Sequence, residues 1–103
     1  MEFLINLGIS NRAIESLKNN CSKDELSDIV ECSNRVKSSI LLLRGFGINN
    51  STIEDILVMD YHKLMPGGQH LIKAFQRVSN LSEFVNNLNR DVVTYMDYLD
   101  NIF

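Results

Sequence analysis

Residues that interrupt helices are scarce in this sequence, since 103 residues include one proline and five glycines. Proline and glycine are the poorest helix formers, so their scarcity leaves room for helical segments. Segments that alternate apolar and polar residues with β-branched enrichment, as strands do, are also lacking. The sequence therefore predicts an all-α fold, a compact bundle of about five or six helices in a single domain over residues 1–103.

A strong charge of either sign is lacking as well. Ten Lys and Arg face thirteen Asp and Glu, which leaves a net charge of −3. This mild acidity disfavours nucleic acid as a partner, because domains that bind it are usually basic. No apolar run approaches the roughly 20 residues of a membrane span, and Glu2 stands where a signal peptide carries positive charge. We expect a cytoplasmic protein with no membrane partner.

Motifs of catalysis and metal binding are the third absence. Cys21 and Cys32 lack metal or redox spacing, and His62 and His70 have no further ligand at local spacing. There is no nucleophile elbow, and the carboxylates are scattered. The sequence thus predicts free thiols, surface histidines, no metal, no cofactor and no enzymatic activity.

Helical periodicity dominates what is present. Ser22-Lys-Asp-Glu25 has the form of a capping box, and apolar residues then recur at three- and four-residue steps. We expect one long helix over about 23–45, ended by Gly45-Phe-Gly47, because glycine tolerates the left-handed conformation that ends helices.

Five further helices follow from the same signals. The first seven residues form a short helix, and Ser10 caps the next. Ser51-Thr-Ile-Glu54 is a second apparent capping box and opens a helix over about 52–60. After the breaker cluster Met65-Pro-Gly-Gly68, helices are expected over about 68–78 and 83–101.

Two stretches of the chain are nearly alike. LGISNRAIESLK at residues 7–18 and FGINNSTIEDIL at residues 46–57 align with Gly8 on Gly47, a period of 39, with five identities in the eleven residues from that glycine on. In each stretch a helix ends at glycine, an isoleucine follows, a polar residue caps, and a new helix begins. The sequence therefore predicts two similar helix-turn-helix corners.

Three interpretations of this corner stay open. Packing alone could produce it twice, because any helical corner needs a glycine, an apolar residue and a cap. A DNA-binding helix-turn-helix is the second, although that motif usually wants a small residue where Leu43 stands, and Glu54 and Asp55 would lie against phosphates. A stacked helical repeat is the third, since a period of 39 suits such arrays.

The two units contain an apolar pair, Leu/Phe-Gly-Ile and a short helix that ends in Ile-Leu, with a Leu-rich helix as a further feature. This order resembles the repeat of the mitochondrial transcription termination factor family, over residues 3–18 and 42–65. The resemblance implies stacked α-helical repeats, and family members bind double-stranded nucleic acid along a basic groove. This chain is instead acidic, holds two units, and has Tyr61 where a proline is typical. The resemblance therefore implies the repeat shape more than nucleic-acid binding.

Two surfaces are candidates for binding. Gly67 and Gly68 begin a helix on which His70, Lys73 and Arg77 follow at three- and four-residue steps, so phosphate, nucleic acid or an acidic partner could dock there. The alternative is a solvated helix face.

The second surface is the C-terminal end, where Asp97 and Asp100 stand among Tyr98 and Phe103. Aromatic residues dominate interface energetics, so these four residues are candidates for contact with another protein. The alternative is that the aromatics close the core. The resulting prediction is a non-enzymatic protein-binding or regulatory module of adaptor or inhibitor type. The alternative is a nucleic-acid-binding helical repeat or helix-turn-helix protein, and homo-oligomerisation stays open.

Overall fold

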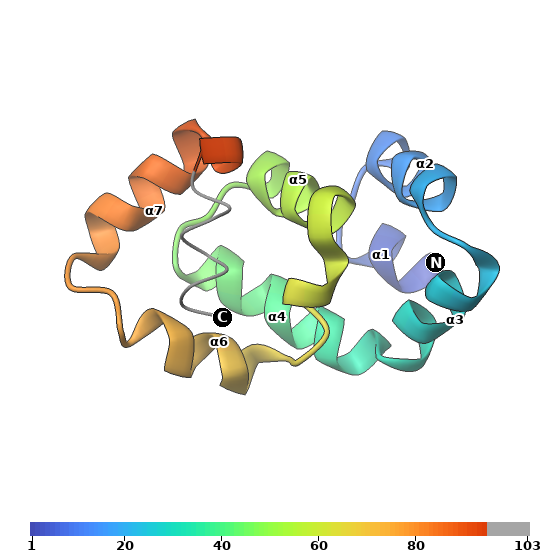
Figure 1. The fold of residues 1–103 in the computed structure, drawn as a ribbon, viewed down its shortest axis with the longest axis horizontal. Coiled ribbons are helices and arrows are strands. Elements are labelled where there is room, and N and C mark those ends of the chain that lie inside the picture. Colours follow the sequence, from blue (N-terminus) through green and yellow to red (C-terminus); the bar gives the residue numbers. More distant parts are fainter. Residues whose placement is uncertain (95–103) are drawn as a thin grey trace.

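Helices make up the secondary structure of residues 1–94, the part of the chain that the computed structural model describes (Figure 1). No strand occurs within these residues, and the predicted all-α fold is confirmed. The helices are α1 (Glu2–Asn6), α2 (Asn11–Asn20), α3 (Lys23–Glu31), α4 (Ser33–Gly45), α5 (Asn50–Asp60), the short 3₁₀ helix η1 (Tyr61–Lys63), α6 (Gly68–Phe75) and α7 (Leu81–Arg90).

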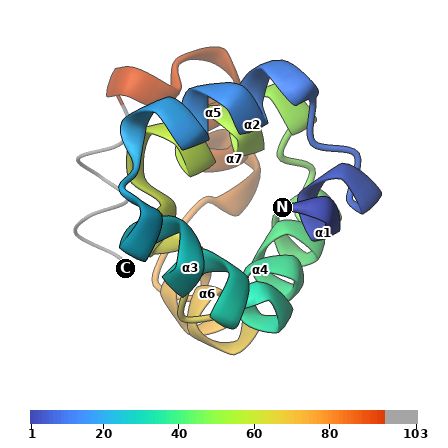
Figure 2. The ribbon, with the colours of Figure 1, turned by 90° about the vertical axis from the view of Figure 1, so that its right-hand side faces the viewer.

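The chain alternates between two layers of helices. In Figures 1 and 2, α2, α5 and α7 lie along one side of the molecule, and α4 and α6 lie along the other. Helix α2 packs on α5, α4 packs on α6, and α1 packs on α4. Each layer is therefore a row of neighbouring helices, and the chain crosses from one layer to the other after α4, after α5 and after α6.

The hydrophobic core lies between the layers and takes residues from every α-helix. Its fully buried members are leucine and isoleucine, whose burial stabilises the fold by roughly 1.5–3 kcal/mol each. They are Leu4, Leu17, Ile29, Ile40, Leu43, Ile53, Ile56, Leu57, Leu64, Leu71 and Leu88.

The corners at Gly8 and Gly47 have the same backbone geometry. Both glycines have positive φ, +83° and +93°, which side chains other than glycine rarely adopt. In each corner the following isoleucine, Ile9 or Ile48, donates its N–H to the carbonyl five residues earlier, at 3.0 and 3.1 Å. Both isoleucines are 3% exposed. This pattern of hydrogen bonds is the Schellman motif, and it turns the chain from one layer into the other.

Side chains of other helices donate hydrogen bonds to both corners. At the first, the Gly8 carbonyl accepts from the Asn50 amide at 3.1 Å, and the Arg44 guanidinium donates to the Leu7 carbonyl. At the second, the Asn89 side-chain amide donates to the Gly47 carbonyl at 2.9 Å. The Asn89 side-chain oxygen accepts from the backbone N–H of Asn49 at 2.8 Å. Tertiary hydrogen bonds thus complete turns whose backbone shape is local.

The predicted helix over 23–45 is wrong, because the structure divides it at Cys32. That residue has φ −93° and ψ 15°, and α4 begins after it at Ser33. Cysteine, serine and asparagine, which stand in a row here, are weak helix formers. The break allows Ile29 of α3 and Val36 of α4 both to be buried, at 0% and 1% exposure. The capping box of Ser22 and Glu25 is confirmed.

The predicted capping box at Ser51 is also wrong. Helix α5 begins at Asn50 with Asn49 as its N-cap, so Ser51 lies inside the first turn. The Glu54 carboxylate instead accepts the backbone N–H of Ser10 at 2.6 Å. Glu54, which matches a local capping motif in the sequence, therefore forms a hydrogen bond across the interface between α2 and α5.

Two expected helices end earlier than the sequence indicates. Helix α6 ends at Phe75 rather than near 78, so Arg77 lies in the connection to α7. Helix α7 ends at Arg90, and Asp91 has φ −152° and ψ 81°, so the expected helix over 83–101 is interrupted. The Asp91 side chain accepts from the Thr94 N–H and hydroxyl, which gives it the local bonds that favour a helix boundary over a helix interior.

Candidate binding groove between α4 and α6

The glycine pair before α6 serves the contact between α6 and α4. Gly67 has φ +99°, and the Gly68 N–H donates to the Ser38 hydroxyl of α4 at 3.0 Å. A Cβ on Gly68 would stand 2.6 Å from that hydroxyl oxygen, closer than atoms can approach. The pair that the sequence singles out for anion binding therefore has a structural use, because it lets the two helices approach.

The remaining residues predicted for an anion site are spread along α6 and beyond it. His70 is half-buried, whereas Lys73 and Arg77 are exposed. Lys73 lies on α6 itself, and Arg77 follows the end of the helix. The structure thus keeps Gly68, His70 and Lys73 on one helix with Gly67 as its N-cap, but places Arg77 on the loop. The other predicted surface, formed by Asp97, Tyr98, Asp100 and Phe103, lies outside the described residues.

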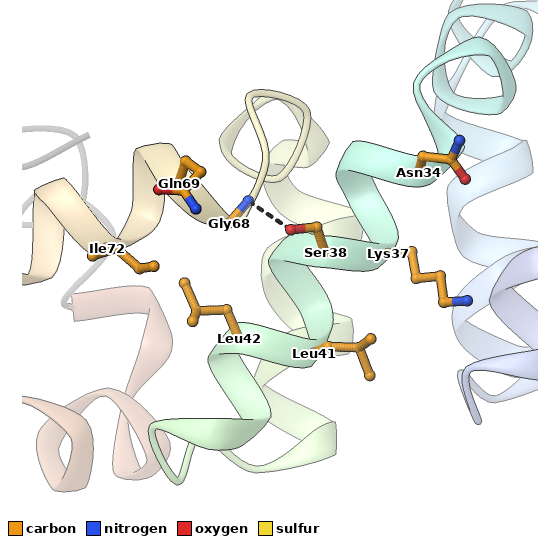
Figure 3. Close-up of a pocket in the computed structure, with 8 residues that line it drawn as sticks. All are labelled: Asn34, Lys37, Ser38, Leu41, Leu42, Gly68, Gln69 and Ile72. Atoms are coloured by element: carbon orange, nitrogen blue, oxygen red, sulfur yellow. Dashed lines mark hydrogen bonds between the residues drawn. The ribbon is translucent and has the colours of Figure 1, made fainter.

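A groove of about 530 Å³ runs between α4 and α6. In Figure 3 the side chains of Leu42 and Ile72 point toward one another across it, and the Ser38–Gly68 hydrogen bond joins its two walls. Leu41 and Lys37 stand beside Leu42 and Ser38 on α4 and form the edge of the groove that points away from α6, and Leu41 is 48% exposed. The lining residues are Asn34, Lys37, Ser38, Leu41, Leu42, Gly68, Gln69 and Ile72.

The helices that form this groove carry no carboxylate. Neither residues 32–53 nor residues 61–82 contain an Asp or Glu, although the chain as a whole has thirteen. Helix α4 carries Arg35, Lys37 and Arg44, and α6 carries Lys73. The groove therefore combines an apolar floor with one basic lining residue, Lys37, on helices that carry no acid, in a protein whose net charge is negative.

The neighbouring helix α3 has the opposite charge. Four of its nine residues are Asp or Glu, against the single basic residue Lys23. It also exposes an apolar residue, Val30, which is 47% exposed and so matches Leu41 closely. Charge is thus segregated between adjacent helices, and the apolar groove lies on the acid-free side.

A second group of ionisable residues surrounds Tyr61. Burial, and then the hydrogen bond that its hydroxyl donates to Glu25 at 2.9 Å, raise the pKa of Tyr61 to about 12. Burial, together with the nearby Glu25 charge, also raises the pKa of the Cys21 thiol. A thiol with a raised pKa is a poor nucleophile at neutral pH. This group therefore has the properties of a structural network rather than of a reactive site.

Metal binding and membrane spanning find no support in the described part of the chain. Within residues 1–94 no three His, Cys, Asp or Glu side chains gather where they could hold a metal ion. Over the same residues, none of the helices is both long and apolar enough to cross a membrane. Cys21 and Cys32 are free thiols.

Comparisons with protein-family models, with curated proteins and with solved structures give no match.

The groove was not predicted from the sequence, although the sequence contains a signal for it. Ile40 is followed by three leucines, and four successive apolar residues cover more of a helix circumference than one core contact needs. Ile40 and Leu43 are buried, whereas Leu41 and Leu42 face the groove. Only the packing of α4 against the other helices decides which leucines are buried and which line the groove.

Proposed function

We propose that this protein is a non-enzymatic protein-binding module of adaptor or inhibitor type, and that the groove between α4 and α6 is its docking surface. One observation carries the proposal: apolar side chains line a groove on helices that carry no carboxylate. Apolar surface gathered in a groove and rimmed by polar residues is typical of interaction sites. Lys37, Asn34 and Gln69 supply that polar rim.

The non-enzymatic assignment is supported by where the ionisable side chains lie. The groove lining includes one charged residue, Lys37, and no pair that could act as acid and base. The ionisable residues around Tyr61 are instead bonded to one another, as in the bond from Tyr61 to Glu25. A groove without a catalytic pair is suited to recognition rather than to chemistry.

A nucleic-acid-binding function is the second candidate, and the acid-free face of α4 and α6 favours it. Lys37 and Lys73 could contact phosphates there, and such binding would weaken steeply with salt. The apolar groove lining argues for a protein instead, because leucine and isoleucine offer nothing to phosphates. We therefore rank protein binding first.

The test uses two equally exposed apolar residues on adjacent helices. Leu41→Asp places a charge in the groove, and Val30→Asp makes the same change on α3 outside it. Partners cross-linked in cell extract by the wild type and identified by mass spectrometry should be lost with Leu41→Asp and retained with Val30→Asp. Partners retained by both variants would exclude the groove.

Fluorescence anisotropy with generic duplex and single-stranded DNA and RNA separates the two candidate functions. We expect no binding at physiological salt. Salt-sensitive binding that is lost when Lys37 and Lys73 are both changed to Glu would favour the nucleic-acid function.

A further inference from the structure

We propose that the occupant of the α4–α6 groove is an acidic amphipathic helix of a partner protein, with apolar residues on one face and carboxylates beside them. This inference rests on the proposed function and names the partner class for the same groove.

The groove suits two turns of helix. Its lining on α4 runs from Asn34 to Leu42, which at 1.5 Å per residue is about 12 Å. Two helices packed side by side leave a furrow between them, and a third helix can lay one row of side chains into it. Leu42 and Ile72, facing one another in Figure 3, would form the floor under apolar residues four apart on the incoming helix.

The walls of the groove favour a helix over an extended peptide. An extended segment binds by pairing its backbone with an exposed strand edge. Residues 1–94 contain no strand, and the backbone groups of α4 and α6 are engaged within their own helices away from the ends. A helical partner satisfies its own backbone, so it needs only side-chain contacts from this surface.

The charges select an acidic partner. Lys37 lines the groove, Lys73 lies one turn beyond Gln69 on α6, and neither helix carries a carboxylate. A basic partner helix would find no counter-charge here and would be repelled by Lys37. An acidic one gains that contact, and complementary charge sets which partner is chosen more than how tightly it binds.

The experiment uses three fluorescent, alanine-based helical peptides of about 16 residues, enough for a measurable helix population. The first has leucines four residues apart with flanking glutamates. The second has lysines in place of the glutamates, and the third has serines in place of the leucines. Anisotropy titrations are run against the full chain and against Leu41→Asp, Val30→Asp and Lys37→Glu.

The expected result has three parts. The glutamate peptide binds about fivefold more tightly than the lysine peptide, as one surface ion pair allows, and the serine peptide does not bind. Leu41→Asp weakens the glutamate peptide at least about tenfold, because it places a charge against an apolar face, while Val30→Asp leaves its affinity unchanged. Lys37→Glu reverses the preference, so that the lysine peptide becomes the tighter ligand.

Several outcomes would overturn the inference. An unchanged preference in Lys37→Glu would show that the groove does not select acidic partners. If no peptide binds while extract partners remain sensitive to Leu41→Asp, the helical occupant is wrong and the binding function stands. Self-association of the chain that Leu41→Asp abolishes, measured by analytical ultracentrifugation, would make a second copy the occupant. Loss of both peptide binding and extract partners would remove the proposed function as well.

Discussion

Helices α2 and α3 both begin with a serine that caps the first turn, yet each completes its capping box differently. At α3 the Ser22 hydroxyl accepts from the Glu25 N–H at 3.1 Å, and the Glu25 carboxylate accepts from the Ser22 N–H at 3.0 Å. At α2 the Ser10 hydroxyl accepts from the Ala13 N–H at 3.2 Å. Alanine has no carboxylate to return, and Glu54 of α5 supplies it from 44 residues away.

This difference separates local from tertiary specification. The box at α3 closes within four residues and needs no other helix. The box at α2 closes only when α5 is packed beside it, so its second hydrogen bond also joins two helices. We therefore expect loss of the Glu54 carboxylate to be felt by both α2 and α5 and a change at Ser22 to stay near α3.

The largest difference should come from the residues that precede the two caps. Ile9, before Ser10, is 3% exposed in the core, whereas Cys21, before Ser22, is only partly buried. Ile9→Ala should lower the free energy of unfolding by about 3 kcal/mol because it leaves a cavity, and Cys21→Ala by less than about 1 kcal/mol. Urea unfolding of both variants measures this, and equal losses would contradict the distinction.

The next largest effect is expected at Glu54. Glu54→Ala removes the acceptor for the Ser10 N–H and should cost about 1–2 kcal/mol, as for a charge-assisted hydrogen bond. Amide hydrogen exchange at Ser10 should accelerate as well. Asp55→Ala, the neighbouring exposed carboxylate, is the control and should change stability by less than about 0.5 kcal/mol. A Ser10 amide that exchanges at the same rate in the Glu54 variant would rule out the bond across the two helices.

The serine caps themselves should be equal. Ser10→Ala and Ser22→Ala each remove one hydroxyl that accepts a backbone N–H in the first turn. Each should cost about 1 kcal/mol, the usual value for an N-cap. Thermal unfolding of the two variants compares them directly, and a cost at Ser10 several times that at Ser22 would show that the hydroxyl, and not only Glu54, takes part in the tertiary contact.

The smallest effect should be a pH dependence specific to the α3 box. The hydrogen bond from the Ser22 N–H, and then that from the Tyr61 hydroxyl, lower the pKa of Glu25 below its ordinary value of 4.5. The folded chain therefore binds fewer protons at this site than the unfolded chain, so stability is present above pH 4.5 and is lost as the pH falls through the folded pKa. Glu25→Gln should flatten this part of the stability profile. An acid limb identical to that of the wild type would assign it to other carboxylates.

Sequence-based prediction succeeded where the determining contacts are close along the chain. The caps at Ser10 and Ser22 and the ends of helices at Gly8 and Gly47 depend on neighbours within five residues, and all were expected. It failed at Ser51, where a local match exists but Glu54 bonds to α2 instead. It also failed at Cys32, where nothing as strong as proline or glycine marks the break.

The groove is another feature that the sequence did not predict. Its leucines are visible in the sequence as a run from Leu41 to Leu43, but burial of Leu43 and exposure of Leu41 depend on how α4 packs against the other helices. The glycine pair at Gly67 and Gly68 was a candidate for anion binding in the sequence, with a solvated helix face as the alternative. The contact with Ser38, thirty residues away, gives it a packing role that no local pattern contains.

The sequence by itself determined the all-α class, the two helical turns at Gly8 and Gly47 and the absence of acidic residues from two stretches of the chain. Those properties follow from propensity, capping and composition, which act over a few residues. Only the tertiary structure decided that these two acid-free stretches supply the adjacent helices α4 and α6 and that Glu54 caps α2. Both depend on contacts between distant residues, and such contacts are selected by the packing of the whole core rather than by any segment alone.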